Sequence, residues 1–300
     1  MNILSIDIGG TSIKYGVVDS KGMILQKDSV KTPGADCKNA IPEIIINTFQ
    51  ELSRDYKIEA IGISTAGLID SEKGMVILSA KLPGYTGCKL KEKIEPKTGV
   101  QVFVENDANC AALGEMWKGA GKNNKFIVFL TLGTGVGGAC ILNGKLYKGF
   151  HGFAGEFARV SAASGILEGK QRHDILFDWT ASTSSLVNRY KKLTDQNIDG
   201  IELMARVKAK EESALLVYDD FINSLCNGLD TVVSLFDPEV VVIGGGISAQ
   251  GDFFFSHLNK VFQVYIPEGY EDVIIKKALL ENDAGMFGAA YICLHKDYVV

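Results

Sequence analysis

The stretch Ile3-Leu4-Ser5-Ile6-Asp7-Ile8-Gly9-Gly10-Thr11 decides the fold of this chain. Its first six residues alternate in character and are rich in β-branched side chains, which predicts a strand, and the glycines that follow predict a turn. A second strand is expected over Ile13–Val18 and a third over Met23–Gln26, after a turn at residues 19–22. The N-terminal segment is therefore expected to form a strand meander with a glycine turn at its first corner.

The same order of elements recurs in the second half of the chain. Phe126–Leu132 predicts a strand, Gly133-Thr134-Gly135 a turn, and Gly137–Leu142 a second strand. Asn143-Gly144 is a typical hairpin signal, and Lys145–Tyr147 predicts a short third strand. Two such units in one chain predict a duplicated α/β core with two related lobes.

Helices are expected between these strands. Ile41–Tyr56 has apolar side chains at helical spacing, with Pro42 placed in the first turn. Further helices are expected over Ala108–Trp117, Glu211–Leu235 and Gly285–Leu294. Glycine and asparagine weaken regular structure near Trp117–Lys125. We therefore expect an N-terminal lobe at residues 1–118 plus about 285–300, and a C-terminal lobe at residues 119–284.

The composition sets limits on function. The 300 residues are 46% hydrophobic and 22% charged, with a formal net charge of −5, which is ordinary for a globular protein and argues against a general nucleic-acid binder. No segment is long and apolar enough for a bilayer, and no signal peptide is expected, so a cytoplasmic location is predicted. The six cysteines are scattered without a CxxC pair, which favours reduced thiols in or near the core.

The two glycine turns carry the first chemical signal. Glycines in Gly9-Gly10-Thr11 let backbone N–H groups approach a phosphate, and Asp7 beside the turn could hold magnesium directly or through water. The alternative is a tight hairpin that simply needs glycine. Because Gly133-Thr134-Gly135 repeats the pattern, the two turns predict a pair of loops that close on one polyphosphate. The chain has no GxxxxGK[ST] motif, and the strand–turn–strand context does not fit GxGxxG.

Three further segments could hold a substrate. In Glu105-Asn106-Asp107-Ala108-Asn109 a strand ends where a helix begins, so that a carboxylate could take a proton from a hydroxyl while an amide fixes a sugar. Helix N-capping is the alternative explanation. Glu156 follows a glycine-rich loop and could bind sugar hydroxyls, or the loop could simply be solvated. The glycines of Gly244-Gly245-Gly246 after a buried strand permit flat packing of a base or ribose, or form a plain strand-to-helix turn.

Taken together, these residues resemble the ROK family of bacterial sugar kinases, within the actin-like ATPase superfamily. The resemblance extends from Ile3 to about Ala290. Its motifs appear in family order: Asp7-Ile8-Gly9-Gly10-Thr11, Gly62-Ile63-Ser64-Thr65-Ala66-Gly67-Leu68-Ile69-Asp70, Leu82-Pro83-Gly84-Tyr85, Glu105-Asn106-Asp107-Ala108-Asn109, Leu132-Gly133-Thr134-Gly135-Val136-Gly137, Ala154-Gly155-Glu156 and Ile243-Gly244-Gly245-Gly246.

The resemblance implies a two-lobed actin-like ATPase fold of the ribonuclease H-like type, with duplicated mixed-sheet lobes and a cleft between them. It implies ATP-dependent phosphorylation of glucose or a β-glucoside-type hexose, with magnesium at Asp7 and Asp107 as the catalytic base. The implied sugar ligands are Gly67, Asn106, Asp107, Glu156 and Asp178. The implied ATP ligands are Gly9, Gly10, Thr11, Lys14, Gly133, Thr134, Gly135, Gly244, Gly245 and Gly246. ROK proteins are often dimers, so a homodimer is implied as well.

The chain departs from the family pattern on the sugar side. Arg159 occupies the position of a histidine that binds structural zinc, and no cysteine occurs between Val160 and Trp179. Because zinc needs three or four nitrogen or sulfur ligands, His173 alone cannot supply a site, and no zinc is predicted. Asp178 replaces a family glutamate, and Lys81 replaces an asparagine.

Other functions remain open from sequence. The altered residues could suit N-acetylmannosamine or another amino sugar as the substrate. The chain could also be a non-catalytic sugar-sensing ROK protein, or an actin-like filament protein. The intact Asp107 and both glycine turns favour a kinase over these two classes.

Overall fold

A computed structural model describes residues 1–161 and 175–300. The chain divides into two compact units. The first unit comprises Met1–Asn123, Ile141–Ala154 and Leu279–Val300, and the second comprises Asn124–Cys140 and Gly155–Ala278. This grouping differs from the predicted lobes in assigning residues 119–123, 141–154 and 279–284 to the first unit, and the lobe boundaries given above stay a prediction.

The first unit is built on a five-stranded mixed sheet with the order β3-β2-β1-β4-β7. β1 pairs antiparallel with β2 and parallel with β4, which pairs parallel with β7. The strands are β1 (Asn2–Ile8), β2 (Ser12–Asp19), β3 (Ile24–Lys31), β4 (Ile58–Thr65) and β7 (Gln101–Asn106). A separate two-stranded sheet joins β5 (Leu68–Asp70) to β6 (Met75–Leu78). The predicted N-terminal meander is confirmed.

The third strand of the meander is longer than predicted. β3 runs to Lys31, where it still pairs with Ser12, whereas the prediction ended at Gln26. Most of its side chains are exposed. A strand without a buried face lacks the alternating apolar pattern from which its length could be predicted.

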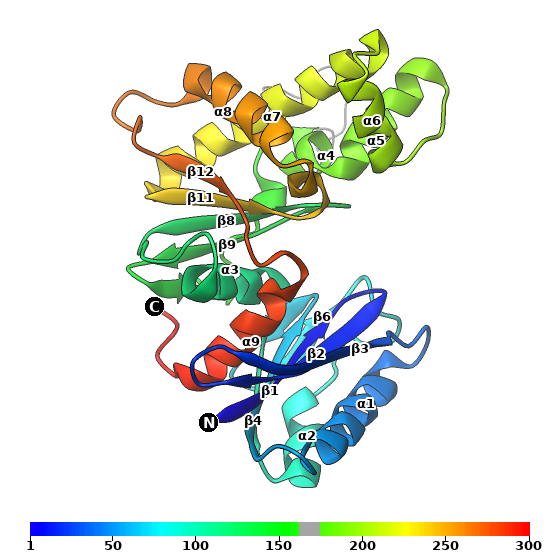
Figure 1. Cartoon of the computed structure of the whole chain (residues 1–300), viewed down its shortest axis with the longest axis vertical. Coiled ribbons are helices and arrows are strands. Elements are labelled where there is room, and N and C mark those ends of the chain that lie inside the picture. Colours follow the sequence, from blue (N-terminus) through cyan, green and yellow to red (C-terminus); the bar gives the residue numbers. More distant parts are fainter. Residues whose placement is uncertain (162–174) are drawn as a thin grey trace. The chain divides into compact units, whose positions relative to one another are not determined.

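Helices cover both faces of the first sheet (Figure 1). Alternate side chains of β1, including Leu4 and Ile6, pack in one core with α1 (Cys37–Leu52) and α2 (Leu90–Thr98). The Ser5 hydroxyl of the same strand donates to the Met286 carbonyl of α9 (Ala284–Leu294), which packs in turn on α3 (Asp107–Lys118). The absence of a side chain at Gly62 of β4 allows α9 to approach this closely, since a Cβ there would lie 1.9 Å from the Ala289 carbonyl oxygen.

The start of α1 corrects a prediction. The helix begins at Cys37, so Pro42 is its sixth residue and not part of the first turn. Proline has no N–H to donate to the carbonyl four residues earlier, here that of Lys38. Lys93 Nζ lies 2.8 Å from this carbonyl oxygen and donates to it, so the helix tolerates the proline.

The second sheet has the order β10-β9-β8-β11-β12, and β11 is parallel to both β8 and β12. The strands are β8 (Ile127–Leu132), β9 (Val136–Leu142), β10 (Lys145–Tyr147), β11 (Val240–Gly244) and β12 (Ile274–Lys277). Three consecutive strands followed by two parallel ones repeat the order of the first sheet. The predicted duplication and α/β class are confirmed.

The second unit buries its own core, to which the long α7 contributes many residues. Its helices are α4 (Phe177–Ala181), α5 (Thr183–Thr194), α6 (Gly200–Lys208), α7 (Glu212–Phe236) and α8 (Asp252–Tyr265). Single 3₁₀ turns occur at Phe157–Arg159 and Gly246–Gln250, and in the first unit at Glu281–Asp283. Across residues 1–161 and 175–300, no helix has the length and apolar character needed to cross a membrane.

Candidate active site

The strand register of the first unit brings three predicted segments to one sheet edge. Ile8 pairs with Thr65, and Thr65 pairs with Asn106, on the parallel strands β1, β4 and β7. The turn after Ile8, the loop after Thr65 and the helix after Asn106 therefore start side by side. This carboxyl edge of parallel strands is where open α/β sheets usually bind ligands.

Asn106 is the N-cap of α3. Its Oδ1 accepts from the Ala108 and Asn109 N–H groups at 2.9 and 3.1 Å, so the N-capping that sequence left open is present. Its Nδ2 donates to the Gly67 carbonyl at 2.9 Å and to Asp107 Oδ1 at 3.0 Å. The side chain thus orients both neighbours, and its direct contact with sugar stays a prediction.

Asp107 presents one bound and one open carboxylate oxygen. Its Oδ1 accepts from Asn106 Nδ2 and from the Ala108 N–H, both at 3.0 Å. Among the residues that the structure describes, Oδ2 accepts no hydrogen bond. The carboxylate is therefore fixed in orientation through one oxygen and can take a proton on the other.

Gly67 holds a backbone conformation that only glycine adopts readily. Its φ is +126°, and an added Cβ would lie 2.4 Å from the Leu78 carbonyl oxygen. Since its own carbonyl accepts from Asn106, Gly67 is part of the same corner.

The first glycine turn is closed by backbone and hydroxyl hydrogen bonds. The Gly9 N–H donates to the Ser12 carbonyl at 3.0 Å, and Thr32 Oγ1 donates to the Gly9 carbonyl at 2.7 Å. A Cβ at Gly10 would meet no atom within 4 Å, so open space lies beside the backbone there. Lys14, on the next strand, donates from Nζ to the Asn282 carbonyl at 3.1 Å.

Asp7 lies beside this turn with its carboxylate in a confined position. Ser64 Oγ donates to Asp7 Oδ1 at 2.7 Å, and a Cβ at Gly285 would lie 2.5 Å from the same oxygen. Burial raises the pKa of the Asp7 carboxyl, although the Ser64 hydrogen bond and Lys14 oppose the shift. Magnesium commonly uses only one or two carboxylates together with substrate phosphates, so the Asp7 carboxylate fits such an ion.

Metal sites made by the protein alone are a different matter. Within residues 1–161 and 175–300, no group of three or more His, Cys, Asp and Glu side chains could hold a metal ion. His173 and most of the stretch between Val160 and Trp179 lie outside the described residues. The prediction of no zinc therefore stays a prediction.

The second glycine turn is held by a carboxylate. Asp178 Oδ1 accepts from the Val136 N–H at 2.6 Å, and a Cβ at Gly135 would lie 2.6 Å from that oxygen. The Thr183 N–H donates to the Gly133 carbonyl at 2.8 Å, while a Cβ at Gly133 would meet nothing within 4 Å. Sequence reasoning assigned Asp178 to the sugar and missed its contact with the turn, because the partners lie 42 residues apart.

The third glycine segment has a structural requirement of its own. β11 ends at Gly244, and Gly245 has φ +88° with its Cβ position 2.4 Å from the Leu132 carbonyl oxygen. The strand-to-helix turn left open by sequence is therefore present. Gly246 meets no atom within 4 Å at its Cβ position, and the role of this segment in binding ATP stays a prediction.

Glu156 is exposed and precedes the 3₁₀ turn at Phe157–Arg159. The preceding Gly155 has φ +89°, and its Cβ position lies 2.9 Å from Ala139 Cα, so the backbone here needs glycine. Arg159, which stands at the family histidine position, is exposed as well.

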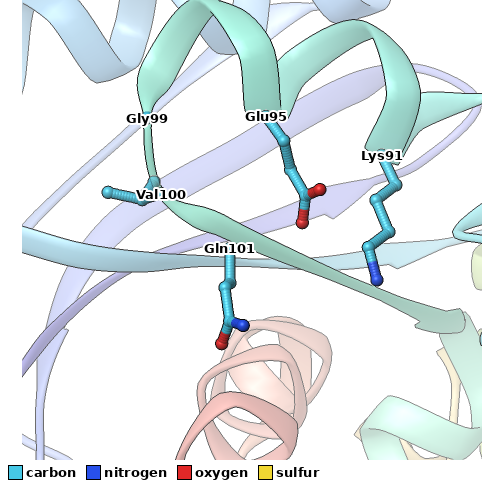
Figure 2. Close-up of a pocket in the computed structure, with 5 residues that line it drawn as sticks. All are labelled: Lys91, Glu95, Gly99, Val100 and Gln101. Atoms are coloured by element: carbon cyan, nitrogen blue, oxygen red, sulfur yellow. The ribbon is translucent and has the colours of Figure 1, made fainter.

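A surface pocket of about 400 Å³ lies elsewhere in the first unit, lined by Lys91, Glu95, Gly99, Val100 and Gln101. Figure 2 shows Lys91 and Glu95 projecting from α2, with Gln101 at the start of β7. Glu95 Oε1 accepts from the Val102 N–H at 2.9 Å, so this carboxylate serves the backbone. Because Asn106 is at the other end of the same strand, roughly 17 Å away at ~3.3 Å per residue, the pocket is separate from the Asp107 corner.

Comparison with known proteins agrees with these motifs. The family model described as "ROK family" matches residues 3–296. A β-glucoside kinase of Listeria monocytogenes is 33% identical over 99% of both chains, and a glucokinase of Thermotoga maritima is 31% identical over 97% of both. A solved structure of a ROK family glucokinase from Streptomyces griseus, in complex with glucose and AMPPNP, has a TM-score of 0.79 at 30% identity and covers 97% of this chain and 99% of that one. The chain belongs to the ROK family.

Proposed function

We propose that this sugar kinase transfers the γ-phosphate of ATP to a hydroxyl group of glucose or of a β-glucoside, with Asp107 as the base. The observation that carries the proposal is the Asp107 carboxylate, which is held through Oδ1 and leaves Oδ2 without a partner in the described residues. The names of the relatives support the substrate class, since they include a β-glucoside kinase and glucokinases.

The chemistry asked of the protein is mainly positioning. As the sugar hydroxyl attacks, Asp107 takes its proton on Oδ2, an effect typically worth about 10²- to 10⁴-fold in rate. Asn106 keeps the carboxylate from rotating and also holds the Gly67 carbonyl, which faces the same corner. Gly67, Asn106, Glu156 and Asp178 are the proposed sugar ligands. For Asp178 this role must be compatible with its hydrogen bond to Val136.

The glycine turns suit a phosphate. The Cβ positions of Gly10, Gly133 and Gly246 are all open, so a ligand oxygen could approach each backbone. Gly9, Thr11, Lys14, Thr134, Gly135, Gly244 and Gly245 complete the proposed set of ATP ligands. Asp7 would hold magnesium, which neutralises phosphate charge when bound.

The variant Asp107→Asn tests the base. Asparagine keeps Oδ1 as an acceptor for Asn106 and Ala108, and only the second oxygen becomes an amide that cannot take a proton. We expect kcat to fall about 10²- to 10⁴-fold while the melting temperature stays unchanged. The exposed Asp55→Asn serves as a control with wild-type turnover. Wild-type kcat in purified Asp107→Asn would show that another group takes the proton.

A sugar screen tests the substrate. ADP release is measured with hexoses, N-acetylhexosamines and β-glucosides, and the highest kcat/KM is expected for glucose or a β-glucoside. A preference for N-acetylmannosamine would refute the proposed substrate but would be consistent with the proposed kinase activity. Sugar binding without ADP release would instead indicate a sensor. The resemblance also supports a cytoplasmic homodimer, whose oligomeric state light scattering of the purified protein would measure.

A further inference from the structure

A buried carboxylate lies directly before the Asn106–Asp107 corner and takes no part in the mechanism above. Glu105 is only 1% exposed. Its Oε1 accepts from the Asn106 N–H at 2.9 Å and from Asn109 Nδ2 at 3.0 Å. Since these donors are the N-cap residue of α3 and a residue in its first turn, Glu105 fixes the orientation with which the helix leaves β7.

The other oxygen of Glu105 is held by residues distant in sequence. Oε2 accepts from Lys148 Nζ at 2.8 Å, from Ser71 Oγ at 2.9 Å and from the Tyr298 hydroxyl at 3.1 Å. The Lys148 side chain is itself only 13% exposed. A buried ion pair is often no more stabilising than apolar residues of equal size, so its presence here suggests a use other than stability.

Lys148 also anchors the loop that leads to Glu156. Its carbonyl accepts from the Ala154 N–H at 3.0 Å and closes the loop between them. Gly149 and Gly152 in that loop have φ of +67° and +82°. One residue therefore holds the catalytic corner through its side chain and the base of the loop through its backbone.

The C-terminal segment completes the arrangement. The Leu146 N–H donates to the Tyr298 carbonyl at 2.6 Å, and the Val300 N–H donates to the Leu146 carbonyl at 3.0 Å. This parallel bridge places the segment alongside β10, from which Lys148 follows directly. The hydroxyl of Tyr298 and the ammonium of Lys148 thus reach the same carboxylate oxygen from adjacent segments.

We propose that Lys148 is a positioning residue for the sugar site, because it locks Glu105, and through it Asn106 and Asp107, to the base of the 149–154 loop. The inference rests on the proposed function in one respect, namely that Asn106 and Asp107 face the sugar. It assigns Tyr298 and Ser71 as the hydroxyl partners that hold the same carboxylate oxygen.

The experiment compares Lys148→Met with Lys145→Met in the full chain. Lys145 is on β10 and makes an exposed ion pair with Asp297 at 3.5 Å, so its loss controls for removing a positive charge nearby. Because a misplacement of about 1 Å can cost ~10²-fold in rate, we expect Lys148→Met to lower kcat about 10- to 100-fold. We also expect it to raise the sugar KM and the Kd of the same sugar measured by calorimetry without ATP. The ATP KM should stay within about twofold, since none of the proposed ATP ligands belongs to this network. Lys145→Met should match the wild type in all four quantities.

A second variant keeps the test decisive if Lys148→Met does not fold. Tyr298→Phe removes one neutral hydrogen bond and leaves the ion pair, so it should fold and shift kcat and the sugar KM in the same direction by a smaller factor. The inference would be overturned if folded Lys148→Met had wild-type kcat and sugar KM and only a lower melting temperature. If Lys148→Met does not fold, the same result for Tyr298→Phe would overturn it.

The failure of this inference is separable from failure of the proposed function. The ratio between the two lysine variants is measured on whichever sugar the wild type phosphorylates, so a wrong substrate assignment leaves the comparison intact. A wrong base assignment appears in Asp107→Asn and not in this ratio.

Discussion

The pair Gly133→Ala and Gly135→Ala separates the structural from the ligand-binding role of the second glycine turn. The two glycines are two residues apart, and neither has a positive φ. A Cβ at Gly135 would overlap Asp178 Oδ1 at 2.6 Å, whereas a Cβ at Gly133 would enter open space. The same chemical change therefore meets opposite surroundings within one turn.

The expected magnitudes differ in kind. In Gly135→Ala the carboxylate must move, which weakens its hydrogen bond to the Val136 N–H. Losing a hydrogen bond to a charged group costs about 1.5–3 kcal/mol and overpacking about 1–3 kcal/mol, so we expect a combined loss of about 2.5–6 kcal/mol. In Gly133→Ala the loss of flexibility in the unfolded chain stabilises by about 0.4–1 kcal/mol, so the melting temperature should stay equal or rise.

In Gly133→Ala we expect ATP binding to weaken although stability does not fall. If the open space beside Gly133 receives a phosphate oxygen, the new methyl group displaces a charge-assisted contact worth about 1.5–3 kcal/mol. That corresponds to an increase of about 10- to 150-fold in the ATP KM, with the sugar KM unchanged.

Thermal unfolding and steady-state kinetics on both variants measure these effects. A wild-type ATP KM in Gly133→Ala would refute the phosphate role of this turn. Equal melting temperatures for the two variants would refute the argument that the contact between Asp178 and the turn is needed for stability.

Three further predictions concern the body of the protein. Gly288→Ala should cost at least about 3 kcal/mol of stability, because its Cβ would lie 1.8 Å from the Cys110 carbonyl oxygen where α9 meets α3. Its control, Gly34→Ala, whose Cβ would meet nothing within 4 Å, should be neutral in thermal unfolding. Glu115→Ala should also cost about 3 kcal/mol or more in denaturant titrations, because this fully buried carboxylate accepts from the N–H groups of residues 120, 279 and 280. Its control, Glu43→Ala at an exposed ion pair, should change stability by less than about 1 kcal/mol. The six buried free thiols should react slowly with a disulfide reagent at pH 8 and faster as pH rises. For Cys140, burial raises the pKa to about 12, which leaves a thiolate fraction of only about 10⁻⁴ at pH 8. Rapid reaction of the native protein would contradict this prediction.

Sequence predicted the repeated strand order because it is encoded locally. The apolar alternation in β1 and β8 and the glycines after each are visible without knowledge of the fold. The length of β3 was predicted too short, because its exposed, mostly polar residues are defined as a strand only by their pairing with β2. Sequence also misplaced the start of α1, because the carbonyl opposite Pro42 is satisfied by Lys93, which is 55 residues from its acceptor.

The candidate site shows the same division. Asn106 and Asp107 were found because a strand end, a cap residue and a carboxylate are consecutive. Glu105 was visible in the same motif, but its partners Lys148 and Tyr298 lie 43 and 193 residues away. An ordinary lysine after a hairpin and a tyrosine near the C-terminus carry no local signal that they meet one carboxylate.

Comparison of the two glycine turns suggests how duplication produced unequal halves. Asp7 stands two residues before Gly9, and the equivalent residue before Gly133 is Thr131. The second turn instead takes its carboxylate from Asp178 of α4, whose Oδ1 accepts from the Val136 N–H. The two turns therefore use their carboxylates differently: the first has a strand carboxylate, Asp7, which we propose for a cation, and the second uses Asp178 to hold the turn in shape.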